Sequence, residues 1–243
     1  MLWPMRPALP PTRAPWVLRM TWRDLCFLHW PVAPEAIART LPAGAEVETR
    51  EGRAWLGAVP FRMTGVSLRL LPGVPGVSAF PELNLRTYVR VDGVPGVWFY
   101  SLDAAQPLAV RLARRLFHLP YFDARMWADT REGVTRYASL RTHRGTAPAR
   151  FAAAYRPVGP ALDPAPGSLD AWLTDRLVLY STDGRGRLYR GRVDHVAWPL
   201  RRAEAVVTGN TLADGLGVTL EGEPHLLHAE RLEVRAWPLE RVR

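Results

Sequence analysis

The sequence contains no lysine, and this absence excludes one group of enzyme mechanisms. All 32 of its basic residues are arginine. A Schiff base between a protein and a carbonyl substrate needs a side-chain amine, which lysine supplies. A lysine-dependent decarboxylase mechanism is therefore excluded.

The sequence is equally poor in cysteine, with Cys26 alone. A single cysteine cannot form an intrachain disulfide, and the strand-like apolar context of Cys26 indicates an inert buried thiol. No His-Glu-x-x-His pattern is present and the sequence has only one cysteine, so no metal site is expected. Phosphate-loop, dinucleotide and Gly-x-Ser-x-Gly patterns are also missing, so we expect no cofactor and no esterase-type nucleophile.

Long hydrophobic runs are missing as well. No stretch of about 18 apolar residues exists, and no secretory signal is visible at the start of the sequence. We therefore expect a cytoplasmic protein with no membrane partner. The sequence does not specify whether it forms a homo-oligomer.

The formal net charge of +9 does not indicate nucleic-acid binding. Proteins that bind nucleic acids gather arginines on one face, often with aromatic partners. Here the arginines are scattered, and the longest runs are only 114–115 and 201–202. Nucleic acid is therefore not an expected partner.

Strand patterns outnumber helix patterns by about ten to three or four. The absence of regular strand–helix alternation argues against a parallel doubly wound sheet. Turn signals at 51–52, 92–96 and 183–187 each predict a hairpin. We expect a mainly β protein: a curved, barrel-like, mainly antiparallel sheet with short peripheral helices.

The strongest helix pattern covers residues 103–118. Leucines at 108, 112 and 116 repeat at four-residue spacing, with arginines lying off that stripe. Asp103 and Gln106 have the spacing of a capping pair. Shorter helices are expected at 33–42 and at 168–176, the latter capped by Ser168.

Residues 80–89, "FPELNLRTYV", read as a strand with one polar face. Glu82, Asn84, Arg86 and Tyr88 alternate with apolar residues. This row could face water, or it could face the interior of a barrel, where buried polar groups need partners. Facing inward, Arg86 could pair with Glu82 or hold a carboxylate or phosphate through two donors.

Several blocks of the sequence resemble one known family. "PWVLRMTWRDLCFLHWPV", "EGRAWLGAVPFRM", "FPELNLRTYV", "GVWFYSLDA", "LPYFDARM" and "VDHVAWPL" occur in an order similar to the YqjF-like family of uncharacterised bacterial proteins. The resemblance spans residues 15 to 215 and implies the acetoacetate decarboxylase-like fold, with an interior cavity. We accordingly expect a flexible proline-rich segment at 1–14 and a single domain at 15–243.

The decarboxylases of this superfamily carry a lysine after a proline, in the form Glu-x-x-Gly-x-Pro-Lys. The nearest counterpart here is "RLFHLPY". If Pro120 matches that proline, Tyr121 takes the place of the lysine. Arg115 and His118 then replace the glutamate and the glycine. The resemblance thus implies the fold without the Schiff-base chemistry.

The candidate site residues follow from the polar row and this resemblance. Arg86, Asn84 and Tyr88 are predicted to bind the ligand. Trp98 and Tyr100 on the paired strand are predicted to add aromatic walls. Catalytic residues cannot be assigned, and the candidates for proton transfer are Glu82, Tyr121 and His118. Three of the six histidines, His29, His118 and His195, have aromatic or apolar neighbours typical of core-edge positions.

Three functions remain open at this point. The leading hypothesis is binding of a small organic anion such as a carboxylate inside the barrel. The alternatives are a lyase or hydrolase that uses a carboxylate or histidine, and a non-catalytic scaffold with a filled interior. A cavity of about 300 Å³ or more beside Arg86 would favour a ligand. A nearby carboxylate with a strongly raised pKa would favour an enzyme.

Overall fold

The computed structural model describes residues 14–73 and 76–242, so residues 1–13 of the expected flexible segment lie outside it. The N-terminal half contains, in chain order, β1 (Leu18–Val32), α1 (Pro34–Ala38), β2 (Glu46–Val47), β3 (Ala54–Leu68), β4 (Phe80–Val91), β5 (Val94–Ala104) and α2 (Pro107–Phe117). The remainder contains β6 (Tyr121–Arg131), β7 (Val134–Arg141), β8 (Arg150–Ala161), α3 (Leu169–Thr174), β9 (Val178–Thr182), β10 (Leu188–Asp194), β11 (Leu200–Asn210), the 3₁₀ turn η1 (Asp214–Leu216), β12 (His225–Ala236) and β13 (Glu240–Arg241).

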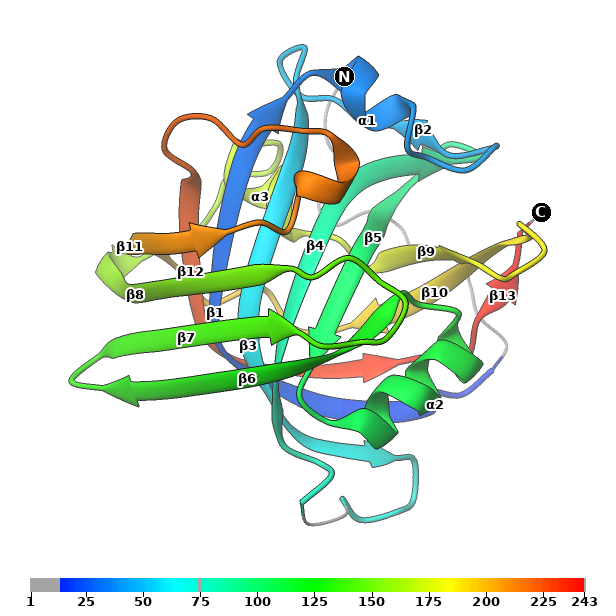
Figure 1. The fold of residues 1–243 in the computed structure, drawn as a ribbon, viewed down its shortest axis with the longest axis horizontal. Coiled ribbons are helices and arrows are strands. Elements are labelled where there is room, and N and C mark those ends of the chain that lie inside the picture. Colours follow the sequence, from blue (N-terminus) through cyan, green and yellow to red (C-terminus); the bar gives the residue numbers. More distant parts are fainter. Residues whose placement is uncertain (1–13, 74–75, 243) are drawn as a thin grey trace.

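The strands form one 13-stranded sheet that closes on itself twice. The shared part is the run β12-β1-β3-β4-β5. On one side of it, β6, β7, β8 and β11 complete a ring of hydrogen-bonded strands, and on the other side β9 and β10 do so. Most pairings are antiparallel, while β5 pairs in parallel with both β6 and β9. The mainly β, curved and barrel-like sheet is as the sequence predicts (Figure 1).

Both faces of β4 are buried along nearly all of its length, which explains its pattern. Its polar row points into the ring closed by β9 and β10, where Glu82, Asn84 and Arg86 are each at most 8% exposed. The alternate residues Leu83 and Leu85 pack in the apolar cluster of the other ring. The polar row therefore faces the interior and not solvent.

The helices mostly follow their sequence signals. The Ser168 hydroxyl accepts a hydrogen bond from the backbone N–H of Ala171 and caps α3, as predicted. The predicted capping pair of α2 is wrong, because α2 begins only at Pro107 and Asp103 lies in β5. The side chain of Gln106 alone caps α2, by accepting from the backbone N–H of Leu108.

The face of α2 that packs on the barrel differs from its leucine stripe. Leu108, Leu112 and Leu116 are 61%, 47% and 50% exposed. The buried residue is Val110, with Ala113 and other small or aromatic side chains packed beside it. Period alone identifies an amphipathic helix, but it does not show which of two apolar stripes meets the core. None of the helices in residues 14–73 and 76–242 has the length and apolarity needed to span a membrane.

Candidate functional site

An interior cavity of about 200 Å³ lies inside the ring closed by β9 and β10. Its walls are mostly apolar and come from β1, β3, β5, β9, β10 and α2. Glu82, Asn84 and Arg86 of β4 contribute polar groups, and Tyr121, Thr174, Arg176 and Arg192 add others from outside β4. This volume is below the value of about 300 Å³ expected for a ligand-binding cavity, so the cavity suits a molecule smaller than a typical drug-sized ligand.

Arg86 is a buried cation at this cavity. Its residue is 8% exposed, and its Nη2 donates to the backbone carbonyl of Leu173 and to the hydroxyl of Tyr88, both at 3.3 Å. Its guanidinium lies 5.3 Å from the ring centre of Phe27. Within the described residues no carboxylate forms an ion pair with it, and its Nε has no hydrogen-bond partner.

Arg86 is connected through Tyr88 to His29 by hydrogen bonds. The Tyr88 hydroxyl lies 2.6 Å from Nε2 of His29 and donates to the Leu173 carbonyl at 2.8 Å. Burial, and then the charge of Arg86, hold the pKa of His29 well below its usual value, so this ring is neutral near pH 7. A Cβ at Gly57 would lie 2.7 Å from the His29 ring, so glycine is what lets the ring fit here.

A second buried arginine, Arg176, also borders the cavity but already has an acidic partner. Its Nη1 lies 2.5 Å from Oε2 of Glu48, and Arg90 contacts the other oxygen of that carboxylate at 2.8 Å. Arg176 also stacks near the rings of Tyr88 and Trp172. Its charge is therefore largely neutralised, whereas that of Arg86 is not.

Glu82 and Tyr121 meet at the cavity wall, although they are 39 residues apart. The Tyr121 hydroxyl donates to Oε2 of Glu82 at 3.0 Å, and both side chains are buried. Burial raises the pKa of Glu82 to about 8, with a smaller contribution from Asp103, and the Tyr121 hydrogen bond opposes this rise. Glu82 is thus mainly a neutral carboxylic acid at pH 7. It bonds with Tyr121 and not with Arg86.

The two aromatic residues expected from β5 do not border the cavity. A β-bulge between Leu85 and Arg86 in the pairing with β5 shifts the register, so that Phe99 lies opposite Arg86. Phe99 therefore lines the cavity, while Trp98 packs in a separate cluster around Val178 and Tyr180. The Tyr100 hydroxyl instead contacts the hydroxyl of Thr40 at 2.6 Å.

His118 is also outside the cavity. It ends α2 in a left-handed conformation, with φ of 49°, and its ring lies 4.9 Å from that of Tyr189. Other cavity residues carried no sequence signal of a site. Trp22 and Phe27 read as part of an apolar strand, and Arg176 reads as the end of a short helix.

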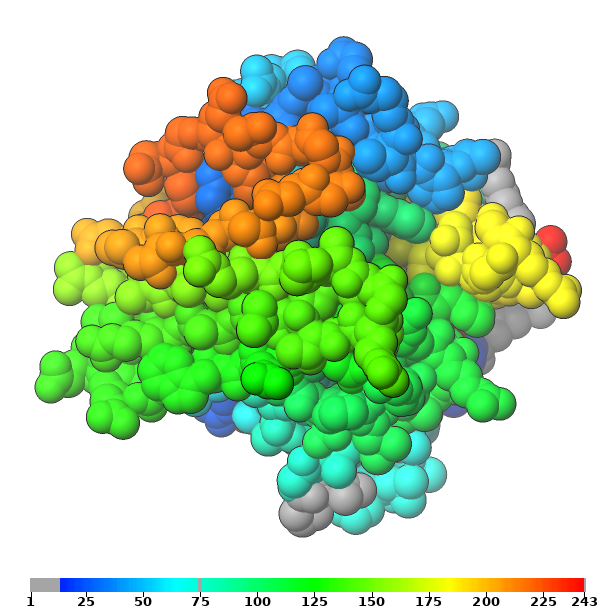
Figure 2. Space-filling view, in the orientation of Figure 1, coloured from blue at the N-terminus to red at the C-terminus, as the bar shows by residue number. Residues whose placement is uncertain are grey.

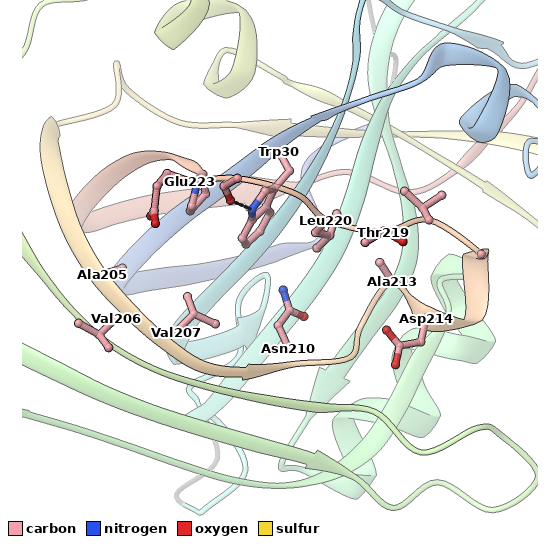
Figure 3. Close-up of a pocket in the computed structure, with 14 residues that line it drawn as sticks. Trp30, Ala205, Val206, Val207, Asn210, Ala213, Asp214, Thr219, Leu220 and Glu223 are labelled. Atoms are coloured by element: carbon pink, nitrogen blue, oxygen red, sulfur yellow. Dashed lines mark hydrogen bonds between the residues drawn. The ribbon is translucent and has the colours of Figure 1, made fainter.

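A second hollow is larger, an open groove of about 810 Å³ beneath the loop that contains η1. Figure 3 shows its lining, in which Trp30 donates to the carbonyl of Gly222 at 3.2 Å. Figure 2 shows this groove between orange segments of the surface, with blue atoms at its base. None of the predicted site residues borders it, and its two acidic residues are Asp214 of η1 and Glu223 of the segment before β12.

Comparisons of structure place the fold among known enzymes. Acetoacetate decarboxylase from Legionella pneumophila superposes with a TM-score of 0.69 at 13% identity, covering 97% of this chain and 93% of that one. The enduracididine biosynthesis enzyme MppR, with HEPES bound, gives 0.68 at 16% identity, covering 96% and 89%. MppR in complex with pyruvate gives 0.64 at 14% identity, covering 96% and 91%. These similarities establish a shared acetoacetate decarboxylase-like fold.

Comparisons of sequence are more specific. The protein YqjF of Bacillus subtilis is 44% identical over 227 residues, covering 93% of each chain. Residues 19–233 match the model of a family described as an uncharacterized conserved protein, DUF2071. The blocks that suggested a YqjF-like protein in the sequence lie mostly within this span. The chain belongs to the DUF2071 family of YqjF-like proteins.

Proposed function

We propose that this protein binds a small organic anion, with a carboxylate as the recognised group, in the cavity beside Arg86. The observation that carries the proposal is a buried guanidinium at a cavity wall, with no acidic partner among residues 14–73 and 76–242. Burying an unpaired charge costs several kcal/mol, so a site of this kind is favoured when an anion completes it.

The surroundings of Arg86 fit this role. Its fork of donors matches a carboxylate in geometry, and Phe27 and Phe99 exclude water nearby, which strengthens a charge-assisted hydrogen bond. MppR, which shares the fold, has been crystallised with pyruvate, a small carboxylate. The absence of lysine means that binding here would involve no Schiff base with a side chain.

Calorimetric titration with pyruvate and with acetate tests the proposal. We expect Arg86→Lys to weaken binding by roughly tenfold to a hundredfold, because lysine has no planar two-donor fork. Arg90→Lys is the matched control, since Arg90 follows on the same strand but contacts Glu48 outside this cavity. Equal affinity of the wild type and Arg86→Lys, or no binding of either anion by the wild type, would contradict the proposal.

Proton transfer is a second candidate function, and Glu82 is the observation that favours it. A carboxyl group with a pKa of about 8 at a cavity wall can donate or accept a proton near neutral pH. Tyr121 would orient this acid and would not act as a base, because burial and Glu82 raise its pKa well above the usual range. A lyase or hydrolase would then lose activity in Glu82→Gln while retaining anion binding.

Borohydride trapping separates both candidates from the chemistry of the lysine-dependent enzymes. With pyruvate present, reduction should give no adduct at any internal residue of the wild type. A stable adduct mapped to a side chain would contradict both proposals as stated.

A further inference from the structure

The polar and apolar parts of the cavity wall follow one another along β4. Phe80 lies opposite Met63 of β3, and Arg86 lies opposite Gly57, so the strand runs from an apolar end to the arginine. Six residues of strand span about 20 Å. The cavity therefore borders a long stretch of sheet while holding only about 200 Å³, which makes it narrow.

The end away from Arg86 is lined by apolar side chains on several elements. On the sheet these are Leu18, Met20, Met63, Val66 and Phe80, and on α2 they are Ala109, Leu112, Ala113 and Phe117. The two alanines keep this end open, because a larger side chain at either position would occupy it. Leu112 borders the cavity and is also 47% exposed, so the wall at α2 is a single side chain thick.

The middle of the cavity carries no strong charge at neutral pH. Glu82 lies four residues from Arg86 along β4, and its bond to Tyr121 satisfies one of its oxygens. Burial keeps its pKa near 8, so the carboxyl is mainly protonated. An uncharged segment of a ligand can pass it, whereas a second carboxylate at this level would lie beside the carboxyl group of Glu82.

We infer that the ligand is an amphipathic monocarboxylate, with its carboxylate at Arg86 and an unbranched apolar tail directed along β4 toward α2. The inference rests on the proposed function and adds the class of ligand. A short keto acid would contact the arginine but would leave the apolar end unfilled. An extended tail would cover the residues there and gain affinity from the burial of its methylenes.

Calorimetric titration with acetate, butyrate, hexanoate and octanoate tests the inference, with 1-octanol as the uncharged probe. We expect the affinity of the wild type to rise by about fourfold per added methylene, up to the length that fills the cavity. Arg86→Gln should lower the affinity for octanoate at least tenfold while leaving the affinity for octanol unchanged. Ala113→Phe should abolish the gain from butyrate to octanoate and leave acetate binding within twofold. Leu116→Phe, which adds similar bulk to an exposed position of α2, should match the wild type.

The outcomes distinguish this inference from the function on which it rests. If all four acids bind with equal affinity and Arg86→Gln weakens each of them, the proposed apolar tail is wrong and anion binding is retained. If octanol matches octanoate and Arg86→Gln changes neither, anion binding is wrong. An unchanged chain-length dependence in Ala113→Phe would place the tail elsewhere and would overturn the inference. The absence of binding by every acid would overturn both. Far-UV circular dichroism and melting temperature should establish first that each variant is folded.

Discussion

The two rings of the barrel share five strands yet differ in what fills them. The ring closed by β9 and β10 contains the cavity, and we call it the cavity side. The ring closed by β6, β7, β8 and β11 contains Leu83, Leu85, Tyr137 and Phe151 in a packed cluster, and we call it the filled side. One strand, β4, serves both, with charged and amide groups toward the cavity and leucines toward the filled side.

The two sides also differ in how completely their buried polar groups are hydrogen-bonded. On the filled side, the Tyr137 hydroxyl donates to two backbone carbonyls, those of Phe61 and Glu82. On the cavity side, the side chains of Trp22, Asn84 and Arg86 each have a buried polar atom without a partner among the described residues, and on β7 of the filled side the Ser139 hydroxyl has none either. Unpartnered buried atoms cost about 1 to 3 kcal/mol each. Three such atoms along one cavity favour a role in binding over a role in stability.

The largest expected effect is on packing, and it compares two leucines. Leu83→Ala on the filled side should lower the free energy of unfolding by about 3 to 4 kcal/mol, because its fully buried side chain leaves a new void. Leu102→Ala should cost about 1 kcal/mol less, since Leu102 borders an existing cavity and has fewer contacts to lose. Urea unfolding measures both. Equal losses would mean that the cavity is closed by packing in solution.

The next effect is a pH dependence of stability that Glu82 on the cavity side should cause. Glu82 ionises near 4.5 in an unfolded chain and near 8 in the fold. Between these values the unfolded state binds fewer protons, so the free energy of unfolding falls as pH rises and levels off above about 8.

The test is the difference between the wild type and Glu82→Gln, which cancels groups common to both. Relative to the wild type, the free energy of unfolding of Glu82→Gln should rise by roughly 3 to 4 kcal/mol between pH 5 and pH 9. Urea unfolding at several pH values gives this difference. A difference that stays constant with pH would show that Glu82 is not held neutral.

Replacing each of the two buried arginines should change the free energy of unfolding by a smaller amount, and the two changes should be of opposite sign. Arg176→Met should lower the free energy of unfolding by about 2 kcal/mol, since Glu48 loses its buried partner and keeps only Arg90. Arg86→Met should raise it by about 1 kcal/mol, because it removes a buried charge that no carboxylate in the described part of the chain balances. The Leu173 carbonyl would still accept from Tyr88. Thermal melts of the unliganded proteins measure both changes. Destabilisation by Arg86→Met would indicate a structural role for this arginine.

Period-two reasoning predicted much of this comparison. The alternation in residues 80–89 identified Glu82, Asn84, Arg86 and Tyr88 as one row, and burial of the row follows from a barrel. The same reasoning failed on β5, because a one-residue bulge is a tertiary feature with no sequence signal there. It also did not single out β6, since Tyr121–Arg131 includes four charged residues and reads poorly as a strand.

The pairs that make up the site were harder to predict than its residues. Tyr121 was a candidate because of its place in a family motif, and its bond to Glu82 depends on the parallel pairing of β5 with β6. Glu82 bonds with Tyr121 and not with Arg86 because of how distant segments of the chain come together in the fold. The same holds for Arg176 and Glu48, which are 128 residues apart. Local patterns do not encode such contacts.

The smallest expected effect in the native protein is the reactivity of Cys26, and it sharpens the contrast between the two sides. Cys26 lies on β1 facing the filled side, and burial raises the pKa of its thiol far above the usual value. Because the thiolate is the reactive form, methyl methanethiosulfonate should leave native Cys26 unmodified over hours. A cysteine placed on the cavity side, Met63→Cys in a Cys26→Ala background, should react at least about tenfold faster, since the reagent can enter beside it. Octanoate should slow that reaction if it fills the same space. Mass spectrometry of the labelled proteins gives the rates, and complete labelling of both in urea shows that each thiol is intact. Equal rates at the two positions would mean that the cavity does not admit small molecules, and that the cavity side is as closed as the filled one.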